Sequence, residues 1–265
     1  MTQAGVGAED LSAYLEFAGR LADAARAVTL AHFRSGIGFE AKADQSPVTA
    51  ADRESESVMR AMIAETYPDH GIIGEEQGNE RADAEFVWIL DPIDGTRSFA
   101  SGKATYGILV ALAHYGRPVV GVMDEPPLAK RWQGAKGQPT TYDGQSVNVR
   151  PCAGVASAWL GATSPHMFRE GIEFERYDHM RRQCGQVVYG GECLAYGFLA
   201  CGWLDLVVEA TMDAYDFAAL VPVVEGAGGV ITDWSGEPLT ANSDGTVIAA
   251  GNAQLHAEAL ALLAG

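Results

Sequence analysis

The sequence predicts a layered protein of the α+β or α/β class, in which helices cover the faces of sheets. Three features predict this: helical periodicity near the N-terminus, a middle region rich in short apolar runs, and alternating strand-like and helix-like segments after residue 150. The chain has 265 residues, 48% of them hydrophobic, which is enough to bury a large core. The pattern leaves the order of the strands open.

The first half is expected to begin with two helices and to continue into strands. Apolar side chains recur at three- and four-residue spacing over residues 9–34 and again over 50–66, where Pro68 closes the second pattern. An Asp143-Gly144 turn favours hairpins within residues 130–149. Short apolar runs bounded by glycine, proline and aspartate predict strands at 86–90, 108–113 and 119–123.

The second half is expected to alternate strands with helices. The strand candidates are 159–162, 186–189, 204–209, 229–232 and 247–250. The helix candidates are 177–183, 193–201, 217–225 and 254–263. This change of pattern predicts two lobes, an N-terminal lobe of residues 1–150 and a C-terminal α/β lobe of residues 151–265.

The charge balance excludes some partners and puts a condition on others. The chain carries 35 Asp and Glu against 18 Lys and Arg, a net charge of −17, which disfavours binding to nucleic acid or to an anionic membrane. A phosphorylated substrate remains compatible if metal ions supply positive charge. The N-terminus has no basic segment followed by an apolar one, and no run approaches the roughly 20 apolar residues of a membrane span. We therefore expect a cytoplasmic protein.

Two other classes of site are disfavoured. The four cysteines form no C-x-x-C pair and the six histidines show no i, i+4 pairing, so a zinc site is not expected. A G-x-S-x-G turn is absent from the sequence, which disfavours an esterase. The cysteines are expected to be reduced thiols.

The segment from Trp88 to Thr96 carries the strongest chemical signal. An apolar strand leads into Asp91, Pro92 is expected to end it, and Asp94 follows three residues later. Two carboxylates on a stiff turn suit Mg²⁺, which prefers oxygen ligands and substrate phosphate. The following Gly95-Thr96 can begin a helix whose N–H groups bind phosphate. Taken alone, the segment also fits an Asp-rich turn with a helix cap.

Two further acidic positions extend this signal. Glu75 follows the apolar run 71–73 at a strand end, and Asp216 precedes the apolar helix expected at 217–225. Each has a simpler alternative, a solvated turn for Glu75 and a helix N-cap for Asp216. Because Asp216 and Asp94 come from different predicted lobes, a shared site would lie between the lobes.

Together these motifs resemble the inositol monophosphatase superfamily of Mg²⁺-dependent, lithium-sensitive phosphatases. The resemblance rests on Gly74-Glu75-Glu76, Trp88–Thr96, Tyr215-Asp216 and, upstream, Pro47–Asp52, which is similar to the family's V-T-x-x-D motif. The motifs occur in family order and span nearly the whole chain. The resemblance implies alternating α-β-α-β-α layers and a homodimer.

Several segments are similar to the histidinol-phosphate phosphatase branch of that superfamily. They are Gly95–Phe99 (GTRSF), Gly121–Pro126 (GVMDEP) and Thr163–Phe168 (TSPHMF). The chain departs from the branch pattern at Glu125, Lys130 and Glu192-Cys193.

The resemblance also implies roles for individual residues. One Mg²⁺ would be held by Glu75, Asp91 and the backbone carbonyl of Ile93, and a second by Asp91, Asp94 and Asp216. Thr96, hydrogen-bonded to Asp52, would position the attacking water beside Glu75, and the Gly95 and Thr96 amides would bind phosphate. Asp44 is a further candidate, either supporting the metal ligands from behind or binding a third ion, and a turn residue near Ser46-Pro47 is the alternative. Two or three Mg²⁺ ions are therefore expected per site.

Two further acidic residues bear on the substrate. Glu192 and Glu209 are candidates for binding the cationic part of L-histidinol phosphate, with a charge pair or a cap as the alternative. Asp205 and Asp213 are expected at the surface. The leading hypothesis is a Mg²⁺-dependent histidinol-phosphatase of histidine biosynthesis. The alternatives are an inositol monophosphatase or broad phosphomonoesterase, and a catalytically silent relative that regulates a partner.

Overall fold

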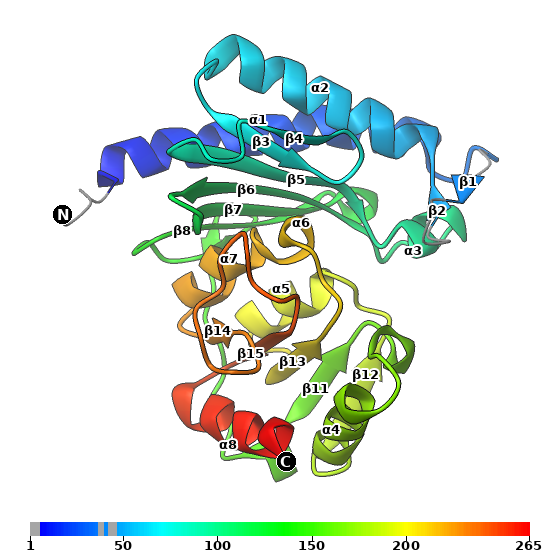
Figure 1. Cartoon of the computed structure of the whole chain (residues 1–265), viewed down its shortest axis with the longest axis vertical. Helices are drawn as coiled ribbons and strands as arrows, with labels where there is room; N and C mark the ends of the chain where they lie inside the picture. The colour runs from blue at the N-terminus through cyan, green and yellow to red at the C-terminus, as the bar shows by residue number, and fades with distance from the viewer. Residues whose placement is uncertain (1–5, 37–39, 42–46) are drawn as a thin grey trace.

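The chain folds into five alternating layers of helices and sheets (Figure 1). The computed structural model describes residues 6–36, 40–41 and 47–265. Helices α1 (Ala8–His32) and α2 (Ala50–Thr66) cover one face of an eight-stranded sheet, and α5 to α7 separate that sheet from a five-stranded one. Helices α4 and α8 cover the outer face of the second sheet. The predicted α-β-α-β-α layering is confirmed.

The first sheet is formed by strands from residues 71–146. Its strand order is β10-β9-β8-β7-β6-β5-β3-β4, with β3 parallel to β5 and the other neighbours antiparallel. The strands are β3 (Gly71–Gly74), β4 (Gly78–Glu80), β5 (Phe86–Asp94), β6 (Gly107–His114), β7 (Arg117–Glu125), β8 (Lys130–Ala135), β9 (Thr141–Tyr142) and β10 (Gln145–Ser146). A separate pair, β1 (Glu40–Ala41) and β2 (Pro47–Val48), lies beside α3 (Thr96–Ala100) in Figure 1.

Both faces of this sheet are buried, which explains its continuous apolar runs. On β5, Trp88 and Leu90 pack into the core beneath α1 and α2. The alternate residues Val87 and Ile89 pack into the core formed with α5 and α7. Strand periodicity of two therefore distributes one apolar segment between two cores.

Strand β5 is longer than the sequence predicted. It was expected to end at Pro92, but it continues to Asp94, with a shift of register between Asp91 and Asp94. The irregularity accommodates Pro92, which has no N–H to donate to β6. Asp91 and Asp94 therefore both lie on a strand and not in a loop.

The second sheet has the order β12-β11-β13-β15-β14 and is mixed. Strands β12 and β13 flank β11 in parallel, and β15 is antiparallel to both β13 and β14. The strands are β11 (Trp159–Ala162), β12 (Gln186–Tyr189), β13 (Leu206–Glu209), β14 (Val230–Thr232) and β15 (Val247–Ala250). The strand prediction is confirmed, with the starts of β13 and β14 shifted by one or two residues.

The helices of the second half are α4 (Ile172–Arg181), α5 (Leu194–Ala200), α6 (Ala214–Phe217), α7 (Leu220–Gly226) and α8 (Ala253–Ala264). The short 3₁₀ turns are η1 (Pro126–Leu128), η2 (Val155–Ser157) and η3 (Pro165–Met167). The single helix expected at 217–225 is instead two helices, and its first one begins before Asp216. The early start reflects a capping box in which Asp213 is the N-cap and Asp216 the third helical residue. The break falls just before Pro222, which lies in the first turn of α7 and has no N–H to donate to the Ala218 carbonyl.

The two-lobe division near residue 150 remains a prediction. It is supported by the strands, because each sheet takes its strands from one side of that position.

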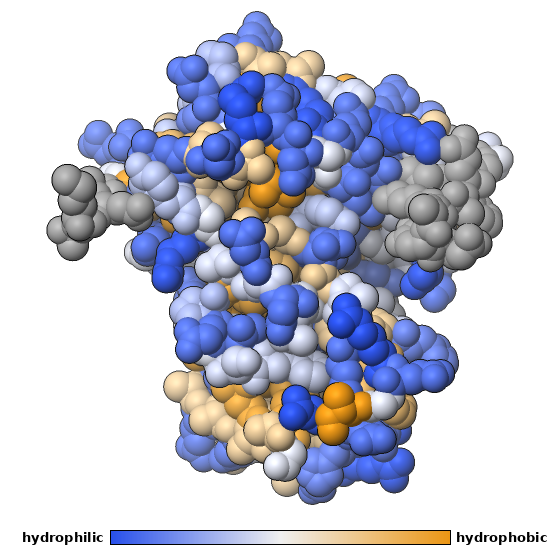
Figure 2. Space-filling view, in the orientation of Figure 1, coloured by the Kyte–Doolittle hydropathy of each residue, from blue (hydrophilic) through white to orange (hydrophobic). Residues whose placement is uncertain are grey.

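Most of the face seen in Figure 2 is hydrophilic, with smaller apolar patches between polar side chains. Across the residues that the structure describes, no helix combines the length and the apolar character needed to span a bilayer.

Candidate active site

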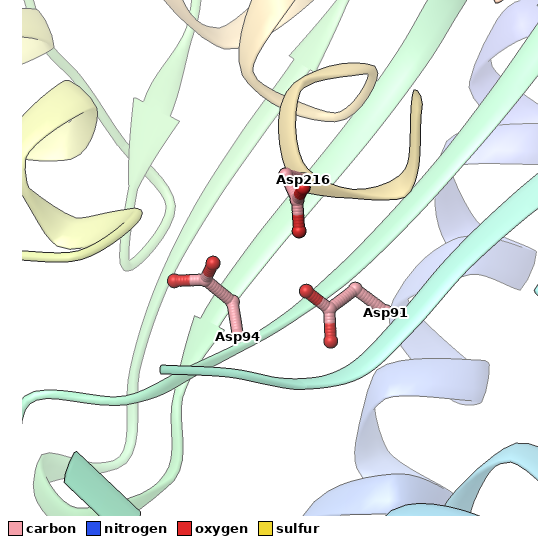
Figure 3. A group of neighbouring side chains, drawn as sticks. All are labelled: Asp91, Asp94 and Asp216. Carbon is pink, nitrogen blue, oxygen red and sulfur yellow. The ribbon is translucent and has the colours of Figure 1, made fainter. Parts of the chain in front are cut away.

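Three aspartates from distant parts of the chain form one acidic cluster. Carboxylate oxygens of Asp91, Asp94 and Asp216 lie within 4.8 Å of one another. Figure 3 shows Asp216, on α6, facing the two aspartates of β5. The cluster lines a cavity of about 820 Å³ whose walls come from residues 75–103 and 163–216.

Each of these aspartates is held in place by a backbone amide. The Ile93 amide donates to Asp91 Oδ1 at 2.9 Å across the bulge of β5. The Cys193 amide, at the start of α5, donates to Asp94 Oδ2 at 2.7 Å. Within the capping box of α6, the Asp213 amide donates to Asp216 Oδ2 at 2.7 Å. Each of these carboxylates therefore keeps an oxygen that these amides do not use.

The cluster is electrostatically unfavourable when its members are all ionised. Burial, followed by the neighbouring Glu75 and Asp94 carboxylates, raises the pKa of Asp91 well above its usual value. Burial raises the pKa of Asp94 in spite of the Cys193 hydrogen bond, and burial together with Asp94 raises the pKa of Asp216. Crowded, desolvated carboxylates of this kind call for a cation.

The donor set fits a hard divalent ion. Carboxylate oxygens from several elements converge at one point, which is how proteins bind Mg²⁺ or Ca²⁺, whereas zinc sites usually contain histidine or cysteine. The predicted ligand Ile93 also lines this cavity. The structure therefore brings Asp91, Ile93, Asp94 and Asp216 together.

Glu75 lies at the same cavity. It follows β3, and its amide donates to the Leu90 carbonyl at 3.3 Å, next to Asp91 on β5. Its side chain lines the cavity and interacts with Asp91. The parallel pairing of β3 with β5 brings the two strand ends side by side.

Gly95 and Thr96 form the turn between β5 and α3. Gly95 has φ of +82° and caps α3, so the predicted helix start at this turn is confirmed. A Cβ atom on Gly95 would lie 2.8 Å from Glu192 Cγ, so glycine is required both by the backbone and by space. The first amides of α3 precede its intrahelical hydrogen bonds and border the cavity.

Asp52 lies behind this site on α2. It is fully buried, and it accepts hydrogen bonds from the amide and hydroxyl of Thr49, at 2.8 and 2.5 Å. The hydroxyl of Thr96 donates to the Ile93 carbonyl at 3.1 Å. The predicted hydrogen bond between Asp52 and Thr96 stays a prediction. Asp44 lies outside the described residues.

Glu192 and Glu209 both line the cavity, but they are bound differently. Both oxygens of Glu209 already accept hydrogen bonds: its Oε1 accepts from the amide and hydroxyl of Thr163, at 2.9 and 2.5 Å, and its Oε2 accepts from the Tyr196 hydroxyl at 3.2 Å. Burial raises the pKa of Glu209 to about 7.

Glu192 retains binding capacity. Its Oε1 accepts from the Ser98 hydroxyl at 2.5 Å, whereas its buried Oε2 has no hydrogen-bond partner in the described part of the chain. Burial raises the pKa of Glu192. Its φ of +45° is uncommon for a non-glycine residue, which marks a backbone under constraint at the site.

Some residues of the site were not identified from the sequence. The Ser98 hydroxyl orients Glu192, and the hydroxyls of Thr163 and Tyr196 orient Glu209. The only sequence signal for these three residues is that they lie in segments that resemble the family pattern. Asp205, expected at the surface, is 2% exposed, because it binds Arg150 and the Trp159 amide. Asp213 is exposed, as expected.

Comparison with known proteins shows which family the chain resembles. Residues 10–264 match the inositol monophosphatase family. The chain is 41% identical over 260 residues to the bifunctional phosphatase IMPL2, chloroplastic, of Arabidopsis thaliana, an overlap of 95% of this chain and 75% of that protein. It is 35% identical over 250 residues to the histidinol-phosphatase of Mycobacterium tuberculosis, covering 92% and 95% of the two chains.

A solved structure shows the same fold. The inositol monophosphatase from Zymomonas mobilis superposes with a TM-score of 0.89 at 43% identity, covering 98% of this chain and 100% of that one.

Proposed function

The chain belongs to the inositol monophosphatase family, as a phosphatase of that superfamily, and from this premise we propose that it is a Mg²⁺-dependent histidinol-phosphatase. It would hydrolyse L-histidinol phosphate to L-histidinol and phosphate. The observation that carries the proposal is the convergence of Asp91, Asp94 and Asp216 within 4.8 Å beside the Gly95-Thr96 turn at the start of α3.

We assign the metal to the carboxylates of this cluster. Glu75, Asp91 and the Ile93 carbonyl would hold one ion, and Asp91, Asp94 and Asp216 a second. Bound Mg²⁺ supplies positive charge for the phosphate and for the leaving oxygen, and it makes water a stronger nucleophile. A third Mg²⁺ ion would bring the number per site from two to three.

The chain's own groups complete the reaction. The Gly95 and Thr96 amides border the cavity and can donate to phosphate oxygens as charge develops in the transition state. Glu75 and the Thr96 hydroxyl would orient the attacking water, and its proton would pass to a carboxylate, either Glu75 directly or Asp52 through the Thr96 hydroxyl. Water attacks phosphorus in line, and the substrate alkoxide leaves, so no covalent phosphoenzyme is required.

Two features favour histidinol phosphate over an uncharged polyol phosphate. The substrate's ammonium and imidazole groups suit a cavity wall that carries Glu192 and Glu209, and one oxygen of Glu192 has no hydrogen-bond partner within the described ranges. A 35% identical relative is named a histidinol-phosphatase. In this role Glu192 would bind the cation directly, and Glu209 would orient the organic part of the substrate.

The alternative is an inositol monophosphatase or a broad phosphomonoesterase. It is favoured by the name of the Zymomonas mobilis structure and by the bifunctional Arabidopsis thaliana relative. A cytoplasmic homodimer remains a prediction. A silent regulatory relative is disfavoured, because acidic residues occupy each expected ligand position of the cavity.

Phosphate release from purified protein in MgCl₂ tests the proposal. We expect a higher kcat/KM for L-histidinol phosphate than for inositol 1-phosphate, and loss of activity in excess chelator. Faster hydrolysis of inositol 1-phosphate would establish the alternative, and full activity in chelator would overturn the metal assignment.

A further inference from the structure

Helix α2 presents a buried carboxylate to the turn that carries Glu75. Glu56 lies one helical turn after Asp52 and is 0% exposed. It does not reach the cavity itself. Its neighbour one turn further on, Arg60, donates from Nε to Glu56 Oε1 at 2.8 Å.

The Glu56 carboxylate also binds two backbone amides of that turn. The Glu76 amide donates to Oε2 at 2.8 Å, and the Gln77 amide donates to Oε1 at 3.0 Å. Residues 75–77 connect β3 to β4, where the chain has left the strand ladder. Two adjacent amides of this kind form an anion-binding turn, and here the anion is a side chain of the same protein.

The backbone around the turn is shaped to admit this carboxylate. A Cβ atom on Gly74 would lie 2.2 Å from Glu56 Oε1, so only glycine lets the carboxylate approach. On the far side of the turn, Arg60 donates to the Gly78 carbonyl. The Gln77 side chain donates to the Ser57 hydroxyl at 2.9 Å, which adds a further contact with α2.

Glu75 is thus fixed from two sides. Its own amide is bound to the Leu90 carbonyl of β5, and the next two amides are bound to Glu56 of α2. The position of the Glu75 carboxylate relative to Asp91 therefore depends on how α2 is docked. A group that is misplaced by about 1 Å can cost on the order of 10²-fold in rate, even when the cause is remote.

We propose that Glu56 is a positioning residue, which holds Glu75 in place for metal binding and for water activation through the Glu76 and Gln77 amides. The inference rests on the proposed function, because it takes Glu75 to be a metal ligand. It does not depend on which phosphate ester is the substrate.

The test is the Glu56→Gln variant of the full chain. Glutamine keeps the size of the side chain but places an NH₂ group against an N–H donor of the turn or of Arg60. We expect the dissociation constant for Mg²⁺, measured by calorimetric titration with MgCl₂, to rise about 10-fold or more, as for other groups that support metal ligands. At saturating Mg²⁺, kcat should fall while KM for the substrate changes little.

Asp205→Asn is the matched control. Asp205 is also a buried carboxylate that binds an arginine and a backbone amide, Arg150 and Trp159, but it lies outside the cavity. This variant should lower the melting temperature while leaving the Mg²⁺ affinity of the folded protein unchanged. Arg60→Lys, which keeps Glu56 and loses the fork geometry, should weaken Mg²⁺ binding in the same direction, even if Glu56→Gln folds poorly.

A double-mutant cycle with Glu75→Gln separates positioning from general destabilisation. If Glu56 acts through Glu75, then Glu56→Gln has little further effect on Mg²⁺ affinity in the Glu75→Gln background. The inference would be overturned if Glu56→Gln weakened Mg²⁺ binding equally with and without Glu75→Gln, or if Glu56→Gln bound Mg²⁺ with wild-type affinity. Either result would leave the proposed function standing. If the wild-type protein takes up no Mg²⁺, the proposed function fails with it.

Discussion

In each aspartate of the cluster, a backbone amide binds one carboxylate oxygen and leaves the other to its neighbours. Asp94 shows this best, because the Cys193 amide occupies Oδ2 and thereby aims the group at its neighbours. The two glutamates of the cavity differ in how many hydrogen bonds they already accept. Glu209 receives three hydrogen bonds, whereas Glu192 keeps a buried oxygen without a partner among the described residues.

Replacing Asp94 with asparagine should abolish most of the activity. Asparagine can still accept the Cys193 amide, so the fold should persist, but it removes a negative charge from the metal site. We expect kcat/KM to fall by about 10²-fold or more, the scale reported for losing one group that stabilises charge in the transition state. Phosphate release at saturating Mg²⁺ measures this, with circular dichroism as the check on folding.

Asp178→Asn serves as its control, because Asp178 lies on α4 and pairs with Arg181 and Arg182 outside the cavity. It should retain wild-type turnover. Wild-type turnover in Asp94→Asn would remove Asp94 from the metal assignment.

Replacing Glu192 with glutamine should affect one substrate selectively. The Ser98 hydroxyl can still donate to the side-chain carbonyl, but the charge that meets a substrate cation is lost. A hydrogen bond to a charged group contributes about 1.5–3 kcal/mol, so kcat/KM for L-histidinol phosphate should fall roughly 10- to 100-fold. Inositol 1-phosphate hydrolysis should change little. An equal loss for both substrates would show that Glu192 supports the Asp94 region and does not select the substrate.

At the scale of elements, the site is built where strands and short helices end. Glu75 follows β3, Asp91 and Asp94 end β5, and Asp216 lies in α6. A bulge in β5 holds Asp91 and Asp94, a capping box holds Asp216, and backbone hydrogen bonds to β5 and to Glu56 hold the turn of Glu75. Helix α2 contributes from outside, through its contact with the turn after β3.

The stability of the protein should depend on pH through His256, which lies on α8. His256 on α8 is buried, its Nε2 lies 2.9 Å from the Thr232 hydroxyl of β14, and burial lowers its pKa from 6.5. The unfolded chain therefore binds a proton that the folded chain resists. The free energy of unfolding should decrease as pH falls below about 6.5, and this contribution is absent above that pH.

Urea unfolding at pH 5 and pH 7.5 measures this effect. Because other groups also titrate in this range, the informative quantity is the difference between the wild type and His256→Gln. The wild type should lose more stability between the two pH values. Parallel pH profiles for the two proteins would contradict the assignment to His256.

For the whole molecule, the net charge of −17 has two distinct roles. Much of the face seen in Figure 2 is hydrophilic, whereas a small acidic subset is gathered in one cavity. Glu75, Asp91 and Asp94 of that subset belong to the first sheet and Asp216 belongs to the helices between the sheets, so they meet only when these layers are assembled. Folding therefore brings like charges together, and a bound cation should relieve the cost.

Magnesium should accordingly stabilise the folded protein. At a Mg²⁺ concentration of about 100 times the dissociation constant, linkage gives about 2.7 kcal/mol, or a rise in melting temperature of roughly 5–10 °C for a chain of this size. A thermal melt with and without MgCl₂ measures the shift, and EDTA should reverse it. Asp94→Asn should show a smaller shift, and an equal shift in that variant would place the ion elsewhere.

Much of the fold was accessible from local patterns. Helix α2 and strands β11, β12 and β15 lie where periodicity predicted them, since amphipathic spacing depends only on which side chains face the core. The passage of β5 through Pro92 was not predictable, because a bulge depends on the partner strand. The start of α6 depends on the reciprocal cap of Asp213 and Asp216, which the apolar pattern of residues 217–225 did not reveal.

By itself the sequence determined the layered class, the family and the acidic residues from which a metal site can be made, because these follow from residue types and from short spacings. The tertiary structure decided which carboxylates meet and which are already satisfied. It buried Asp205 in an ion pair with Arg150, gave Glu209 three hydrogen bonds, and left one Glu192 oxygen without a hydrogen-bond partner among the described residues. It also placed Glu56 behind the Glu75 turn. These outcomes depend on contacts between residues far apart in the chain, and such contacts exist only once the layers have packed.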